Sequence, residues 1–274
     1  MNKRQILNLI SFVLFSLFGA VEAAVIEIAS TPTGRKIGAL SGDITPGDTQ
    51  MVGKFFLKYP SLLGLSLNSR GGDVVEAVRL GELVRALRMP VRVAADGICA
   101  SACFFIWMNG SFRTAGFEGD TKGSGLVGLH RPFLINPSNN EDSLKGQSNV
   151  MVGIRNYLER NLISNRLIDT MMSRSSNDIY WLTRNDLEEL GPTPPPLEEL
   201  YIAKCKYNSR NITQLSEEIN KANLRKDSTT EAILTERLIH AFKCPSDLDI
   251  DAHKATILKL ASGWLPPLPF KTKE

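Results

Sequence analysis

The stretch Asp96-Gly-Ile-Cys-Ala-Ser-Ala-Cys103 decides how the surrounding chain is expected to fold. An apolar run, Val91-Arg-Val-Ala-Ala95, precedes it, and a run without a polar face, Phe104-Phe-Ile-Trp-Met108, follows it. Small residues surround one hydroxyl, that of Ser101. The pattern predicts a strand, a tight turn and the first turn of a buried helix, with Ser101 at the turn. A serine there lies near free backbone N–H groups and the positive end of a helix dipole, and both would stabilise an anion that develops on a substrate.

Ser101 also has a plainer interpretation, as the N-cap of a core helix. The neighbouring elements bear on this choice. Leu62 to Leu67 is a mostly apolar run, typical of a strand buried on both faces. Asn68-Ser-Arg-Gly-Gly-Asp73 follows, and Val74 to Leu87 then has strong amphipathic helical spacing. Strands that alternate with helices through short links predict an α/β fold around a mainly parallel sheet.

Two adjacent glycines, Gly71 and Gly72, stand between that buried strand and the helix. They allow a positive φ and a close approach of the backbone to another group. A plain strand-to-helix turn is the structural alternative. The pattern lacks the third glycine of a dinucleotide fingerprint and the Lys-Ser/Thr of a P-loop. A nucleotide site is therefore not expected here.

Composition limits the classes of partner. The chain has 274 residues, 43% hydrophobic and 22% charged, which suits one globular domain of moderate size with an appendage. The formal net charge of +3 is too small to argue for a nucleic-acid partner. No cysteine or histidine spacing resembles a zinc site, and we expect neither a metal nor a cofactor.

Residues 1–23 have the pattern of a signal peptide. Lys3 and Arg4 give a positive start, Ile6 to Val21 is mostly apolar, and small residues precede an expected cleavage after Ala23. The alternative is that the segment is retained and anchors the chain to a membrane. We exclude it from the fold and expect a periplasmic or secreted protein.

The four cysteines fit an oxidising compartment. Cys205 and Cys244 flank the C-terminal segment and are the natural disulfide pair. Cys99 and Cys103 stand four residues apart among small apolar residues, which predicts two buried thiols, with a local bridge as the alternative.

Domain boundaries follow from proline content. Pro192-Thr-Pro-Pro-Pro196 is a stiff linker. It separates a domain at residues 24–191 from a helical extension at 197–274. The extension is expected to contain separate helices at 212–224, 229–242 and 251–260. Within the first domain, a polar loop is predicted at 136–146, before helices at 150–162 and 166–172.

Three features occur in a fixed order: the Gly71-Gly72 turn, Ser101 at a helix start, and His130 at a strand end. A lone histidine is more often structural than catalytic, so the order matters more than His130 alone. This order and spacing resemble the proteolytic subunit of Clp protease, a family of serine peptidases within the larger Clp/crotonase fold.

Four motifs carry the resemblance. Leu67-Asn-Ser-Arg-Gly-Gly-Asp73 is similar to that family's Asn-Ser-Pro-Gly-Gly, with Arg70 in place of proline. Gly97-Ile-Cys-Ala-Ser-Ala102 is similar to its Gly-x-Ala-Ala-Ser turn, with cysteine for one alanine. Gly128-Leu-His-Arg-Pro132 is similar to its Ile-His-Gln-Pro element, and Asn177-Asp-Ile-Tyr-Trp-Leu-Thr183 to its aspartate segment. The match runs from about residue 35 to 191 and stops at the linker.

The resemblance implies repeated β-β-α units around a mainly parallel sheet. It also implies roles for single residues. Ser101 would be the nucleophile, His130 would accept its proton, and Asp178 would orient the imidazole. Backbone N–H groups would form the oxyanion hole, supplied by Gly72 (or Gly71) and by Ala102. Asp169 is the second choice for the acid, although a carboxylate inside a helix is usually a solvated surface residue.

The resemblance further implies a serine endopeptidase that cleaves peptides or unfolded proteins, and a homo-oligomer built through the helices at 150–172. The family's rings are fed by a cytoplasmic ATPase. The predicted signal peptide implies a compartment without ATP, so we expect no such partner. The sequence also has no P-loop of its own, and we therefore expect ATP-independent activity. Two alternatives remain: a catalytically inactive binding or assembly module, and a crotonase-like or esterase enzyme that acts on acyl groups.

Overall fold

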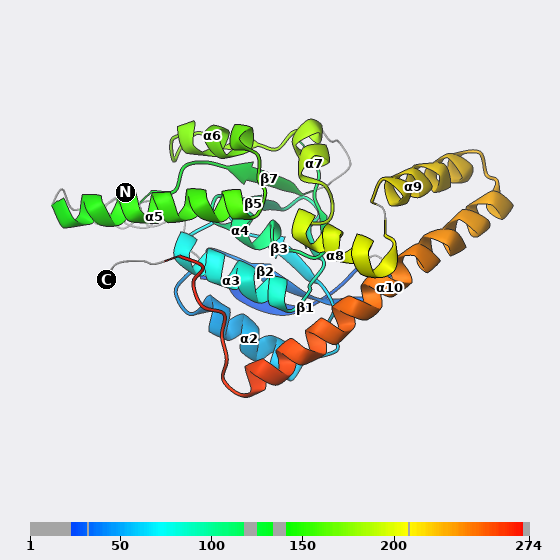
Figure 1. Ribbon diagram of the computed structural model, residues 1–274, viewed down its shortest axis with the longest axis horizontal. Helices are drawn as coiled ribbons and strands as arrows, with labels where there is room; N and C mark the ends of the chain where they lie inside the picture. Colours follow the sequence, from blue (N-terminus) through cyan, green and yellow to red (C-terminus); the bar gives the residue numbers. More distant parts are fainter. Residues whose placement is uncertain (1–22, 32, 118–124, 134–140, 208, 271–274) are drawn as a thin grey trace, which may run out of the picture.

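The protein is described by a computed structural model at residues 23–31, 33–117, 125–133, 141–207 and 209–270 (Figure 1). The predicted signal peptide, apart from Ala23, lies outside these residues, as does the first part of the predicted polar loop. Within them, the strands are β1 (Val25–Ser30), β2 (Lys36–Ser41), β3 (Leu65–Asn68), β4 (Val91–Val93), β5 (Ile98–Ala100), β6 (Arg113–Thr114), β7 (Leu126–Leu129) and β8 (Tyr180–Trp181).

The helices before the proline-rich stretch are α2 (Asp48–Lys58), α3 (Val74–Ala86), α4 (Cys103–Trp107), α5 (Glu141–Arg160), α6 (Asn165–Ser173) and α7 (Arg184–Leu190). Those of the C-terminal segment are α8 (Pro195–Cys205), α9 (Ser209–Leu224) and α10 (Ser228–Ala261).

Two sheets form the framework. The larger has the order β1-β2-β3-β4-β6, with only β1 antiparallel to its neighbour. The smaller has the order β5-β7-β8, in which β5 and β7 are parallel and β8 is antiparallel. The α/β class with mostly parallel strands is therefore correct. The expectation of a single sheet is wrong, because the chain leaves the larger sheet after β4 and starts a second sheet at β5.

The core fills the space that these layers enclose. Helix α4 is buried along its whole length and contacts β4 of one sheet and both β5 and β7 of the other. A helix that packs on all sides has no solvent-facing side, which explains why the sequence of α4 has no polar face. Helix α3 packs against α2 and α4, and its N-cap Asp73 accepts a hydrogen bond from the Glu76 N–H at 2.7 Å. This cap fixes where the glycine turn ends and the helix begins.

The C-terminal segment does not stay apart from the rest of the chain. Of the three helices expected there, the first corresponds to α9. The expectation of two further separate helices is wrong, because they form one continuous helix, α10, with Pro245 inside it. The far half of α10 runs along α2 and α3 (Figure 1). There both ring nitrogens of His253 lie 3.0 Å from backbone carbonyls, those of Leu87 and Pro60. The near half pairs with α9 as a projecting hairpin, the arm at the right of Figure 1.

Two further boundaries differ from expectation. Helix α5 begins at Glu141, inside the predicted polar loop, and α8 begins at Pro195, inside the predicted linker. Proline is favoured in the first turn of a helix because its missing N–H has no acceptor there anyway. Over the described residues, no helix is both long and apolar enough to cross a membrane.

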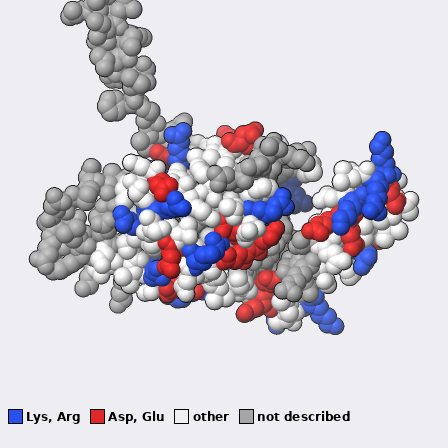
Figure 2. Space-filling view, turned by 90° about the horizontal axis from the view of Figure 1, so that it is seen from above, with Lys and Arg blue, Asp and Glu red and all other residues white. Residues whose placement is uncertain are grey.

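Charged side chains of both signs mix on the face shown in Figure 2, over α5, α6 and α7. Ion pairs link these three helices. Arg166 pairs with Asp186 and Glu189, and Arg155 pairs with Asp169. The Arg155–Asp169 pair is exposed, and such pairs typically contribute about 0–1 kcal/mol to stability. Asp186, in contrast, is buried.

Candidate active site

Ser101 follows directly after β5, and hydrogen bonds on both sides of β5 fix its position. On one side, the Ser69 N–H donates to the Ile98 carbonyl at 2.8 Å, and the Ala100 N–H donates to the Ser69 carbonyl at 3.0 Å. On the other side β5 pairs with β7, and the Ser101 N–H donates to the Gly128 carbonyl at 2.9 Å. These bonds bring the glycine turn, the serine and the end of β7 to one place.

The backbone of Ser101 is in the left-handed region, with a φ of 57°. A residue with a side chain rarely adopts this conformation, and where it does, the site is often functional. The N-cap of α4 is Ala102, with no side-chain cap hydrogen bond. The N-cap interpretation of Ser101 is therefore wrong.

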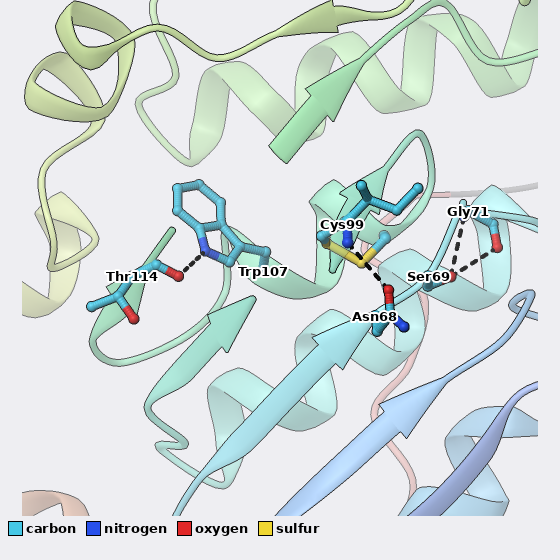
Figure 3. Close-up of a disulfide and its surroundings, with 8 residues drawn as sticks. Asn68, Ser69, Gly71, Cys99, Trp107 and Thr114 are labelled. Carbon is cyan, nitrogen blue, oxygen red and sulfur yellow. Dashed lines mark hydrogen bonds between the residues drawn. A yellow bond between two sulfur atoms is a disulfide. The ribbon is translucent and has the colours of Figure 1, made fainter. Parts of the chain in front are cut away.

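The glycine turn lies directly against the serine. Gly71 and Gly72 have φ values of 116° and 129°. A Cβ on Gly71 would lie 2.6 Å from the Ser101 Cβ and 3.0 Å from its Oγ, so only glycine fits. The turn is closed by Ser69, whose Oγ accepts the Gly71 N–H at 3.1 Å (Figure 3).

That hydrogen bond distinguishes between the two glycines as donors. The Gly71 N–H already has an acceptor. The N–H groups of Gly72 and Ala102 have no hydrogen-bond partner within the described part of the chain. Among the expected donors, these two are the ones available to a substrate oxygen.

His130 follows β7 and is 7% exposed. Its Nδ1 lies 2.9 Å from the backbone carbonyl oxygen of Arg131, and its ring packs on Phe133 with centroids 5.6 Å apart. A carbonyl oxygen can only accept, so this bond assigns the proton to Nδ1. In the neutral ring, Nε2 is then the unprotonated nitrogen, the form that a general base needs.

The two candidate acids, Asp178 and Asp169, both lie at the surface, and each pairs with a different arginine. The Asp178 side chain is 53% exposed and its carboxylate is 2.9 Å from the Arg174 guanidinium. Its segment is nonetheless a neighbour of the histidine, because the Arg131 N–H donates to the Arg174 carbonyl at 3.3 Å. The Asp169 side chain is 64% exposed and pairs with Arg155. The structure thus brings the segments of Ser101, His130 and Asp178 together, while the Asp178 carboxylate bonds to Arg174.

Asp186 is the buried carboxylate of this region, and its oxygens are fully used. It accepts hydrogen bonds from the Tyr180 hydroxyl at 2.8 Å, from the N–H and hydroxyl of Thr183, and from Arg166. Burial alone would raise the pKa of Asp186, but hydrogen bonds from Thr183, Arg166 and Tyr180 outweigh it and hold the pKa below its ordinary value. Asp186 therefore anchors the start of α7.

A cavity of about 550 Å³ opens over the serine and the histidine. Its wall combines the glycine turn with apolar side chains such as Phe133 and Val150 and with charged residues such as Arg70 and Asp73, and both Ser101 and His130 line it. Cavities of about 750 and 760 Å³ lie elsewhere, beside the C-terminal helices, but neither is lined by Ser101 or His130. The cavity over Ser101 and His130 is therefore chosen as the candidate site for the residues that line it, although it is not the largest of the three.

Both cysteine pairs form disulfides. Cys205 bonds to Cys244, as expected. Cys99 bonds to Cys103, so the interpretation of these two as free thiols is wrong (Figure 3). Spacing of four residues within a turn that enters a helix leaves their Cα atoms 5.1 Å apart, within the range that a disulfide spans. Two disulfides fit an oxidising environment.

Two polar groups of the site had no place in the sequence-based prediction. One is the Arg131 carbonyl, which no side-chain pattern reports. The other is Ser69, which stands two residues before Gly71 and closes a turn, a recurrent use of serine that the sequence did offer as a signal. Among the described residues, no three His, Cys, Asp or Glu side chains are grouped closely enough to hold a metal ion.

Comparisons with known proteins assign this chain to no family. No family model matches the sequence, and no curated protein matches it. Among solved structures, a mutant of the membrane-bound stomatin-specific protease 1510-N is 13% identical with a TM-score of 0.39, over 57% of this chain and 75% of that one. A mutant of ClpP1 from Listeria monocytogenes is 18% identical with a TM-score of 0.36, over 55% of this chain and 84% of that one. At these TM-scores the likeness identifies no function, so the site's own residues must carry the proposal.

Proposed function

We propose that the protein is a serine peptidase that hydrolyses peptides or unfolded chains by nucleophilic attack from Ser101. The observation that carries this proposal is the left-handed Ser101, which lies against Gly71 and lines the same cavity as His130. A strained serine beside free backbone N–H groups and a histidine is the arrangement that acyl transfer needs.

In the proposed mechanism, Nε2 of His130 takes the proton from the Ser101 hydroxyl as the oxygen attacks the carbonyl carbon. The negative charge that develops on the substrate oxygen is stabilised by the N–H groups of Gly72 and Ala102. Removing one such donor typically costs about 3 kcal/mol of transition-state stabilisation. His130 then gives its proton to the leaving amine, and water releases the acyl group by the same steps in reverse.

The orientation of His130 has two candidate sources. The Arg131 carbonyl already bonds to Nδ1 and supports a Ser101–His130 pair that works without a carboxylate. Asp178 is the third member that the family resemblance implies. Its exposed pair with Arg174 contributes only about 0.3–0.5 kcal/mol, so a move of the carboxylate to His130 would cost little. We propose the pair as the resting form and retain Asp178 as the alternative orienting group.

Several wider features belong to the same proposal. The enzyme would be exported to the periplasm or beyond, in line with its two disulfides. It would act without ATP, since opening a folded domain costs about 5–15 kcal/mol and the chain has no P-loop to supply that free energy. It would form a homo-oligomer, and its substrates would be peptides, exposed tails or unfolded proteins.

A fluorophosphonate probe tests the proposal, because it reacts much faster with an activated serine than with an ordinary one. Ser101 should be the labelled residue, located by mass spectrometry of the purified protein. Ser101→Ala should lose both labelling and peptide hydrolysis while it keeps the far-UV spectrum and melting temperature of the wild type. Unchanged peptide hydrolysis in Ser101→Ala would overturn the proposal and favour an inactive binding module.

A further inference from the structure

The Cys99–Cys103 disulfide encloses Ser101. Cys99 is the middle residue of β5, Cys103 is the first residue of α4, and Ser101 lies halfway between them. Both cysteines are completely buried. The covalent ring therefore consists of the strand end, the nucleophile turn and the helix start, with its sulfurs on the inner side.

The turn needs such a constraint, because a left-handed residue with a side chain is unfavourable unless its surroundings impose that conformation. Hydrogen bonds hold the strand side, where Ala100 donates to Ser69 and Ser101 donates to Gly128. On the helix side, the carbonyls of Ser101 and Ala102 accept the first N–H groups of α4, from Phe104 and Phe105, both at 3.1 Å. These bonds join the turn to α4 but not to β5, and the Ala102 N–H has no partner within the described part of the chain. The disulfide is the covalent link that ties this second half of the turn to β5.

The size of the ring shows where the disulfide acts. A disulfide constrains the unfolded chain more strongly when it closes a longer loop. Cys99 and Cys103 are separated by 4 residues, whereas Cys205 and Cys244 are separated by 39. The small ring therefore contributes less to global stability, and its main effect is on the local backbone.

We propose that the Cys99–Cys103 disulfide is a positioning element for the nucleophile. It keeps Ser101 in the left-handed conformation, with its hydroxyl toward the cavity and His130. The inference rests on the proposed function of Ser101. Because both sulfurs are buried, the bond is a permanent part of the oxidised enzyme and does not exchange with reductants in solvent while the protein stays folded.

The test compares two double variants, Cys99→Ala/Cys103→Ala and the matched control Cys205→Ala/Cys244→Ala. Each loses one disulfide, but only the first loosens the nucleophile turn. At a temperature where both stay folded, we expect the first to label with fluorophosphonate at least ~10-fold more slowly, and to lose kcat by a similar factor with KM changed less than ~2-fold, as misplaced catalytic groups do. The control should melt at a lower temperature than the first variant and keep the wild-type kcat.

A second variant and a second readout complete the design. Cys99→Val/Cys103→Ala fills part of the space that the sulfurs leave, in case the alanine variant does not fold. Hydrogen exchange of the peptide that contains Ser101 reports the turn directly, because the Ser101 N–H bonds to Gly128. Faster exchange in the variants supports the positioning role. Exchange and labelling at wild-type rates in either folded variant would overturn it.

The two readouts also separate this inference from the proposed function. If wild-type Ser101 does not label, the peptidase proposal fails and the catalytic part of the inference fails with it. Hydrogen exchange then still decides whether the disulfide holds the turn.

Discussion

Replacement of Gly71 by alanine tests how closely the glycine turn defines the nucleophile. The added Cβ would lie 2.6 Å from the Ser101 Cβ, whereas carbon atoms in contact prefer about 3.5–4.0 Å. Relief of this overlap requires Ser101 or the turn to move by about 1 Å. A catalytic group displaced by that distance costs about 100-fold in rate, or about 2.7 kcal/mol in the activation barrier.

The positive φ adds a separate cost. An alanine at 116° is strained by about 1–2 kcal/mol whatever surrounds it. Gly47→Ala is the matched control, because Gly47 has a φ of 103° and no atom within 4 Å of the added Cβ. Gly47→Ala should therefore lose about 1–2 kcal/mol of stability, and Gly71→Ala more, because its Cβ also overlaps Ser101. Only Gly71→Ala should lose activity.

Three measurements decide the outcome: thermal unfolding, the second-order rate of fluorophosphonate labelling, and kcat on a peptide substrate. We expect Gly71→Ala to label and turn over about 100-fold more slowly than the wild type, with Gly47→Ala within about 3-fold. Wild-type labelling by folded Gly71→Ala would falsify the packing argument. Equal losses of activity in both variants would show that destabilisation, not displacement of Ser101, is the cause.

The remaining predictions concern two carboxylates. Asp178→Asn should lower kcat by less than ~10-fold, because the Arg131 carbonyl already orients His130. A loss near ~10⁴ is the size expected when a triad aspartate is replaced by asparagine. Such a loss would identify Asp178 as the third member of a Ser-His-Asp triad. Asp169→Asn, at an exposed helix position, is the silent control. Asp186→Asn should destabilise the protein by about 1–3 kcal/mol at neutral pH, since it removes an ion that accepts several hydrogen bonds. The pKa of Asp186 is held below its ordinary value in the folded state. Its contribution to stability is therefore present above about pH 4 and is lost as the pH falls through the lower, folded-state pKa. Chemical denaturation from pH 7 down to pH 2 should show that Asp186→Asn loses less stability on acidification than the wild type does.

The site was predictable where a residue type implies its own geometry. Adjacent glycines predict a positive φ, and both Gly71 and Gly72 have one. A serine among small residues predicts a tight turn, and Ser101 occupies one. The glycine prediction succeeds because the absence of a Cβ belongs to the residue itself. For Ser101, the sequence predicts the turn, while its left-handed conformation is imposed by the surroundings.

The predictions failed where a distant partner decides the outcome. The segment Ile98 to Ala100 is too short to be predicted as a strand from its sequence. It forms one because Ser69 pairs with it on one side and β7 on the other. The Cys99–Cys103 bond depends on how the turn brings two Cα atoms within 5.1 Å. Helix α10 continues through Pro245, where the sequence predicts a break.

The α/β class, the glycine turn and the position of Ser101 were predictable from the sequence, because they follow from local backbone preference and from the burial of apolar residues. The Cys205–Cys244 pair was predictable for another reason, since these two cysteines flank the C-terminal segment. Other features became visible only in the folded chain. Two sheets form, and the Gly71 N–H is already bonded to Ser69. The Asp178 carboxylate bonds to Arg174, while the Arg131 carbonyl bonds to His130. Each of these depends on which hydrogen-bonding groups the folded chain brings within about 3 Å of one another. A linear pattern carries no record of that distance, since it lists the donors and acceptors but not their neighbours in space.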